Sequence, residues 1–197
     1  MKKVLLSAVA LLTIGFANAQ EEAAATTGGF AKGDMFLSGA FSIGSDKTGD
    51  VKSTGFEIEP KFGFFVTENI AVGAKLGYTS YKAENASVDT ADMAGLTAGA
   101  FGRYYMTPAS QFSLFGEFGF DYTSWEDKLA DAKTNEIGVG LGLGLSYFVS
   151  PNFAIEASWA GLGYTTNDNG GNGAEKTNSF GLGADLRSIS FGLVYKL

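Results

Sequence analysis

The chain has 197 residues, with 14 Lys and Arg, 21 Asp and Glu, no His and no Cys, and its net charge is −7. This acidic balance argues against nucleic acid as a partner, because binding to phosphates needs a basic surface. The absence of Cys excludes disulfides, and the absence of His removes the commonest general base and zinc ligand. With 28 Gly, 17 Phe and only 3 Pro, the composition is not that of a disordered chain.

The first 19 residues have the three parts of a secretory signal peptide. Lys2 and Lys3 precede an apolar run at 4–16, and Ala17-Asn18-Ala19 provides a cleavage site of small residues. The run is shorter than the ~20 residues of a transmembrane helix, which makes an anchor helix the weaker alternative. We predict a cleavable signal helix at 1–19. The mature chain then keeps 12 basic residues (14 − 2) against 21 acidic ones, a net charge of −9.

Residues 20–33 are small and polar, and we interpret them as a flexible periplasmic lead-in. From Asp34 onward, apolar and polar residues alternate in segments long enough for a tilted strand to cross a bilayer, which takes about 9–11 residues. Pro60 lacks an N–H for the ladder, so a local irregularity is expected there. The eight predicted strands are 34–45, 54–66, 70–81, 93–106, 112–125, 135–148, 153–165 and a last strand that begins between Asn178 and Arg187 and ends at Leu197.

The last strand shows this alternation over the final ten residues. The positions between its large apolar residues are small or polar, which predicts one apolar and one polar face. The pattern resembles the closing strand of bacterial outer-membrane barrels, which the assembly machinery recognises and which most often ends on Phe. The large apolar residues of this predicted assembly signal are Ile189, Phe191, Leu193, Tyr195 and Leu197.

The connections between the predicted strands alternate in length. Short turns at 67–69, 107–111 and 149–152 alternate with longer polar links at about 46–53, 82–92, 126–134 and 166–177. This pattern is typical of outer-membrane barrels, in which the longer loops face the outside. An even number of strands then places both barrel termini on the periplasmic side.

A soluble lipocalin-like barrel is the alternative, with the large apolar residues inside. The polar face of each strand, however, carries few charges among Gly, Ser, Ala and Thr. A water-facing surface would carry roughly 25–35% charged residues. We therefore predict that lipid contacts the apolar face, which includes Phe118, Leu141 and Phe191.

The pattern over residues 34–197 is similar to that of the small outer-membrane barrels of the OmpA/OmpX type. The resemblance implies an all-β fold, an eight-stranded antiparallel up-and-down transmembrane β-barrel at 34–197, present as a monomer in the outer membrane. It also implies outer-membrane lipid and lipopolysaccharide as partners, together with periplasmic chaperones and the barrel-assembly machinery.

Charged residues on the predicted inner face are candidates for a lumen network, because charges withdrawn from water must find partners. Such a network either fills the lumen and leaves a structural or surface role, or rearranges as a gate for ions, as proposed for OmpA-type barrels. A third alternative is adhesion through acidic extracellular loops. The predicted network consists of Glu57, Glu59, Lys61, Lys75, Arg103, Glu117, Asp121 and Glu156.

We expect no enzymatic activity, no cofactor and no metal site. Known outer-membrane barrel enzymes resemble one another in their need for a catalytic His, which this chain lacks. The segment 167–173 offers oxygen ligands, but it lacks the spacing and the terminal Glu of an EF-hand loop.

Overall fold

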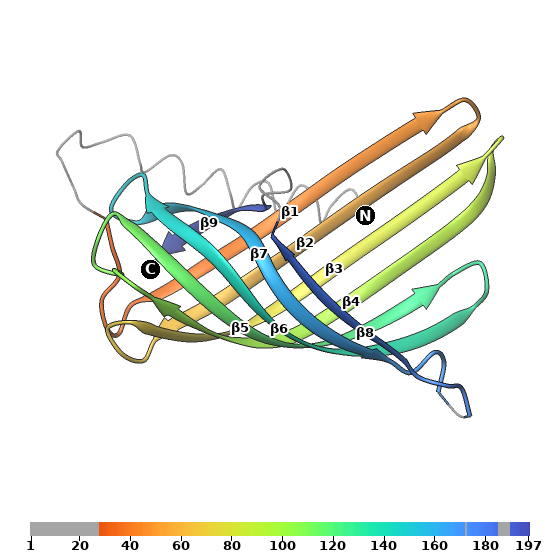
Figure 1. Cartoon of the computed structure of the whole chain (residues 1–197). Coiled ribbons are helices and arrows are strands. Elements are labelled where there is room, and N and C mark those ends of the chain that lie inside the picture. The colour runs from red at the N-terminus through yellow and green to blue at the C-terminus, as the bar shows by residue number, and fades with distance from the viewer. Residues whose placement is uncertain (1–27, 172, 185–189) are drawn as a thin grey trace.

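The computed structural model describes residues 28–171, 173–184 and 190–197, which form one antiparallel sheet (Figure 1). Consecutive strands pair from β1 to β7, and β9 pairs with both β1 and β7, which closes the sheet into a barrel. The predicted signal helix and residues 20–27 lie outside the described residues. The strands are β1 (Met35–Thr48), β2 (Val51–Phe65), β3 (Ile70–Asn85), β4 (Val88–Tyr105), β5 (Phe112–Asp127), β6 (Ala132–Phe148), β7 (Phe153–Asn167), β8 (Thr177–Ala184) and β9 (Ser190–Lys196).

Strands β8 and β9 share one edge of β7. β8 pairs with residues 160–167 of β7, and β9 pairs with residues 153–158. Together they occupy the eighth strand position, so the predicted eight-stranded antiparallel barrel is confirmed. The first of the two begins at Thr177, one residue before the predicted window, and Ile189 lies outside the described residues. Within the described ranges, no helix has the length and apolar character needed to cross a membrane.

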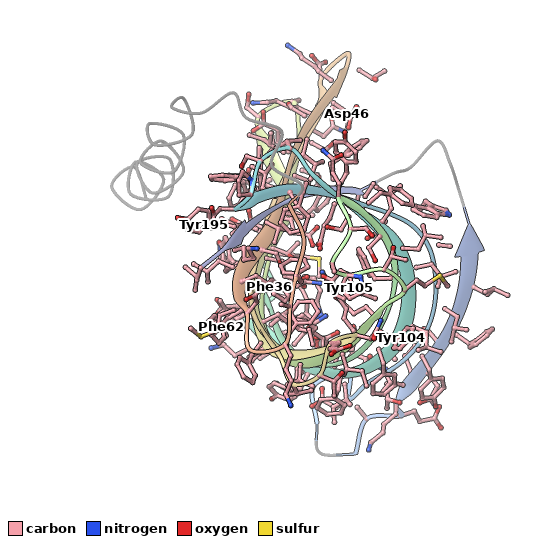
Figure 2. The ribbon with its side chains drawn as sticks, turned by 90° about the vertical axis from the view of Figure 1, so that its left-hand side faces the viewer. Phe36, Asp46, Phe62, Tyr104, Tyr105 and Tyr195 are labelled. Carbon is pink, nitrogen blue, oxygen red and sulfur yellow. The ribbon has the colours of Figure 1, made fainter. Side chains whose placement is uncertain are left out.

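The apolar faces of the strands point outward. The side chains of Phe118 and Leu141 are 54% and 50% exposed, whereas Arg103 is only 4% exposed. Figure 2 looks along the barrel from the end that carries the short turns, with Tyr195 outside the ring of strands and Tyr105 inside it. The orientation predicted from the low charge of the polar face is therefore the one that the structure has.

Three of the four links at the opposite end are shorter than the long loops that we predicted, whereas the link between β7 and β8, residues 168–176, is long as expected. β1 and β2 are joined by Gly49 and Asp50 alone, and β3 and β4 by Ala86 and Ser87, which have φ of 48° and 67°. Positive φ at both central residues suits a two-residue hairpin turn. The alternation fails in these segments because water solvates both faces of a strand beyond the membrane, while the hydrogen-bonded ladder continues.

Three irregularities interrupt the regular ladder between the described strands. One is a shift of register between Ala83 and Glu84 in the pairing of β3 with β4, close to their hairpin turn, which we did not predict. The pairing of β2 with β3 is broken between Ile58 and Lys61 without a change of register, as predicted for Pro60. In β7, Ser158 pairs with Gly144 and Ala160 with Leu143, which leaves Trp159 as the extra residue of a bulge. We did not predict this bulge: Trp159 was assigned to the regular alternation of Ile155 and Ala157, and one extra residue shifts that alternation by one.

Aromatic side chains fill the barrel at the short-turn end. Apart from the small or aliphatic Ala71, Ala154 and Val194, the members of this buried cluster are aromatic. Phe30 belongs to it, although it precedes β1 and lies in the segment that we interpreted as a flexible lead-in. The aromatic members are Phe30, Phe36, Phe65, Phe101, Tyr105, Phe115 and Phe148.

Candidate functional site

Arg103 is the most enclosed charge of the predicted network. It lies on β4 directly opposite Glu117 on β5. Its Nε donates a hydrogen bond to Glu117 Oε2 at 2.6 Å, and its Nη1 donates to Glu156 Oε1 on β7 at 2.6 Å. Two carboxylates thus pair with one guanidinium group that is buried away from water. A buried charge requires such pairing and hydrogen bonding.

Tyr105 joins this cluster, although it was absent from the predicted network. Its hydroxyl accepts a hydrogen bond from Arg103 Nη1 at 2.8 Å and donates one to Glu156 Oε1 at 3.2 Å. The ring of Phe115 covers the guanidinium, with its centroid 4.3 Å from Arg103 Cζ, a cation–π distance. Tyr105 follows Arg103 by two positions, so the period of the strand already places both side chains on one face.

Two lysines face each other elsewhere in the lumen. Lys61 on β2 is directly opposite Lys75 on β3, and like charges in this position usually destabilise a sheet. Glu59 lies between them, with its Oε1 3.3 Å from Lys61 Nζ and its Oε2 3.9 Å from Lys75 Nζ. Lys61 Nζ also donates to Glu117 Oε1 at 2.9 Å, and Lys75 Nζ lies 2.9 Å from Asp121 Oδ1.

Gly99 leaves the space through which Lys75 reaches Asp121. It lies on β4 between them, opposite Lys75 on β3 and opposite Asp121 on β5. A Cβ atom at Gly99 would overlap the carboxylate of Asp121 and lie 3.0 Å from Lys75 Cε. The ion pair between β3 and β5 therefore depends on a glycine on the strand between them.

Every predicted network residue except Glu57 lies within ion-pair distance of another member. The connected set contains three cations, Lys61, Lys75 and Arg103, and four carboxylates, Glu59, Glu117, Asp121 and Glu156. Glu57 is exposed, and the described residues offer it no ion pair. Over the same described ranges, no group of three or more His, Cys, Asp or Glu is arranged to hold a metal ion.

The charged network lies beside the aromatic cluster inside the barrel. Arg103 contacts both, since its Cζ is within 6 Å of ring centroids of Phe36, Phe101, Tyr105 and Phe115. An interior of an eight-stranded barrel is just wide enough for side chains. Arg103 therefore joins the ion pairs to the aromatic cluster within the barrel interior.

A closed antiparallel barrel with apolar side chains outside and paired charges inside defines the class of small transmembrane β-barrels. The chain belongs to the family of the outer membrane protein beta-barrel domain, whose profile matches residues 7–187.

Comparison with solved structures gives the same fold. The outer membrane protein OprG from Pseudomonas aeruginosa matches with a TM-score of 0.52 and 16% identity, over 86% of this chain and 98% of that one. The N-terminal β-barrel domain of OprF from the same organism matches with a TM-score of 0.51 and 14% identity, over 85% of this chain and all of that one (100%). No curated protein matches the chain.

Proposed function

We propose that this protein is a monomeric integral outer-membrane barrel whose lumen is closed by its ion-paired side chains and which has a structural or surface role. Arg103 carries this proposal, because it is held by Glu117 on one side and by Glu156 on the other, across the interior of the barrel. Its carboxylate partners are thereby engaged in ion pairs, so the proposal includes no catalytic acid or base.

The surroundings and partners follow from the two faces of the sheet. Exposed Phe118, Leu141 and Phe191 suit the hydrocarbon of the outer membrane, with lipopolysaccharide in its outer leaflet. Both ends of the barrel chain, Met35 and Leu197, are joined by a hydrogen bond from Leu197 N to Met35 O at the short-turn end. We assign that end to the periplasm, where chaperones and the assembly machinery receive the last strand.

Liposome swelling and planar-bilayer recordings on refolded protein test the closed lumen. We expect no uptake of small sugars and no regular conductance steps. Regular steps in the unmodified protein would contradict the closed lumen and would favour the second candidate, a narrow ion channel.

Shared carboxylates favour that second candidate. Glu117 contacts both Arg103 and Lys61, and Glu59 contacts both Lys61 and Lys75. A cation in such a chain can change its partner without leaving any charge unpaired. If ion pairs open a path in this way, Lys61→Met will change the frequency of conductance steps, whereas the exposed Lys32→Met will not.

Adhesion is a third candidate, favoured by apolar side chains at the hairpin tips. Val51, Val88 and Leu129 are each at least half exposed, at 50%, 66% and 51%. These side chains are potential anchors for a partner on the loop side. If these side chains mediate adhesion, replacing all three with Ser will abolish attachment of expressing cells to host surfaces while leaving folding intact. Unchanged attachment would count against this candidate.

A further inference from the structure

Residues 28–33, here called the strap, span the short-turn end of the barrel. Phe30 N donates to Pro108 O at 2.7 Å in the turn between β4 and β5. Gly33 N donates to Phe65 O at 2.9 Å at the end of β2, and the chain then enters β1. In the order of strands around the barrel, the β4–β5 turn lies opposite β1 and β9. The strap therefore crosses the mouth from one side to the other.

The side chain of Phe30 fills the centre of this mouth. It is 2% exposed, and its ring centroid lies 4.7 Å from that of Phe65, 4.9 Å from Phe148, 5.4 Å from Phe36 and 5.5 Å from Tyr105. These four rings come from β2, β6, β1 and β4. Phe36 and Tyr105 appear inside the ring of strands in Figure 2, which views this end.

Lys196 ties the strap to the last strand. Its Nζ donates to Gly29 O at 2.6 Å and lies 3.7 Å from Asp34 Oδ2, just after the strap. The glycines of the strap permit this close fit, since a Cβ atom at Gly28 would overlap the ring of Phe148 and one at Gly29 would overlap the backbone of Ala109. The strap is therefore seated by polar and apolar contacts at once.

We propose that the strap is a stopper that closes the lumen at the short-turn end, with Phe30 as its plugging side chain. This closure adds to that of the charged network: in the described part of the chain no strap contact involves Arg103, Lys61 or Lys75 directly, and the two meet only through Tyr105, which packs on Phe30 and is hydrogen-bonded to Arg103. The lumen then has two successive barriers, and water or solute reaches the space behind Phe30 from the short-turn end only when the strap leaves its seat.

A single reporter thiol tests the stopper, because the natural chain contains no Cys. Ala71 is fully buried and belongs to the same cluster as Phe30. The rate at which a membrane-impermeant maleimide labels refolded Ala71→Cys protein is measured in three forms. One has the natural strap, one carries Phe30→Ala, and one carries Lys32→Ala as a control, because the side chain of Lys32 is exposed. Because labelling of a buried thiol needs local opening, we expect Phe30→Ala to accelerate it at least about tenfold and Lys32→Ala to leave it unchanged.

Heat-modifiable migration on gels verifies that each variant is folded. An unchanged labelling rate in folded Phe30→Ala protein would overturn the stopper. If Phe30→Ala does not refold, Lys196→Met decides in the same assay: faster labelling supports the stopper and an unchanged rate overturns it. Bilayer recordings on Phe30→Ala distinguish the two barriers. If this variant is labelled fast and also conducts ions, the charged network does not close the lumen, and the proposal of the stopper is still supported.

Discussion

Arg103 shows at the scale of one residue how a barrel can contain a charge. Two carboxylates, one hydroxyl and four aromatic rings surround its guanidinium group. Withdrawing the ions from water is costly, and only good geometry with further hydrogen bonds compensates that cost. Arginine suits this position because its planar group presents several donors in fixed directions.

Removal of this cation is expected to destabilise the barrel strongly. Arg103→Met should lower the free energy of unfolding by about 3–5 kcal/mol, because Glu117 and Glu156 would stay buried without their partner. Urea unfolding in lipid vesicles, followed by Trp fluorescence, measures the change. The control is Lys128→Ala, which removes a partly exposed pair with Asp92 at 3.2 Å and should cost about 0–1 kcal/mol. Equal losses in both variants would contradict the buried pairing.

A second single-residue effect concerns the loop between β7 and β8. The backbone N–H of Asn135 donates to Asp168 Oδ1 at 2.8 Å, its side-chain amide donates to Oδ2 at 2.8 Å, and Gly170 N donates to Oδ1 at 3.1 Å. These donors, the backbone N–H of Asn135 first, lower the pKa of Asp168 below its ordinary value.

The lowered pKa of Asp168 predicts a pH-dependent loop. Its carboxylate contributes stability above the pKa of the unfolded chain, about 3.9, and this contribution is lost as the pH falls through the lower folded-state value. Hydrogen exchange of residues 169–171 should therefore accelerate below about pH 4 beyond the intrinsic pH trend. Asp168→Asn should remove the excess acceleration, and Asp131→Asn in another loop should preserve it. An exchange profile that Asp168→Asn leaves unaltered would refute the role of this carboxylate.

At the scale of the strands, aromatic side chains inside the barrel lie over glycines on the neighbouring strand. Phe36 is opposite Gly63, Phe101 is opposite Gly73, and Phe115 is opposite Gly144. A Cβ atom at any of these three glycines would overlap the facing ring. The glycines thus shape the cavity in which the aromatic cluster packs, and such pairs also help to hold the register between strands.

Two glycines of β6 allow a matched test of these pairs. A Cβ atom at Gly144 would overlap the ring of Phe115, whereas one at Gly142 would meet only Ala160 O at 3.9 Å. Gly144→Ala should lower the free energy of unfolding by about 1–3 kcal/mol through overpacking. Gly142→Ala should change it little or raise it by about 0.4–1 kcal/mol, because the unfolded chain loses conformational freedom. The same urea titration measures both, and equal effects would contradict the packing argument.

At the scale of the whole molecule, closure of the sheet separates two environments. Every backbone group in the hydrocarbon must be paired, which a closed barrel achieves without an edge. Closure also turns one face of all strands outward, so that Phe118 and Leu141 are exposed while Arg103 and Glu156 are enclosed. In a water-soluble barrel this distribution would be reversed.

The two faces should respond differently to a new charge. Leu141→Lys places a cation on the outer face and should cost about 2–4 kcal/mol if that position lies near the middle of the bilayer. Glu57→Lys changes an exposed inner residue that has no ion pair among the described residues, and the effect should stay within about 0.5 kcal/mol. Unfolding of both variants in lipid vesicles compares them. A larger loss for Glu57→Lys would contradict the assignment of the outer face to lipid.

The strand pattern, the two faces and the irregularity at Pro60 were all readable from the residues, because period-two alternation and a missing N–H are local properties of a chain. The same alternation assigned Arg103, Glu117 and Glu156 to one face, and Arg103 forms ion pairs with both of these carboxylates. The extension of the strands beyond their predicted ends could not be predicted from the sequence, because a strand that is surrounded by water on both faces needs no alternation.

Only the tertiary structure decided which inward side chains meet. Glu156 reaches Arg103 from β7, and Phe30 reaches Phe148 from before β1, because closure and register bring strands distant in sequence to the same level of the lumen. No local period encodes such contacts. Tyr105 and Gly99 acquire their roles in the same way, one as a hydroxyl between two charges and the other as the space between two ions.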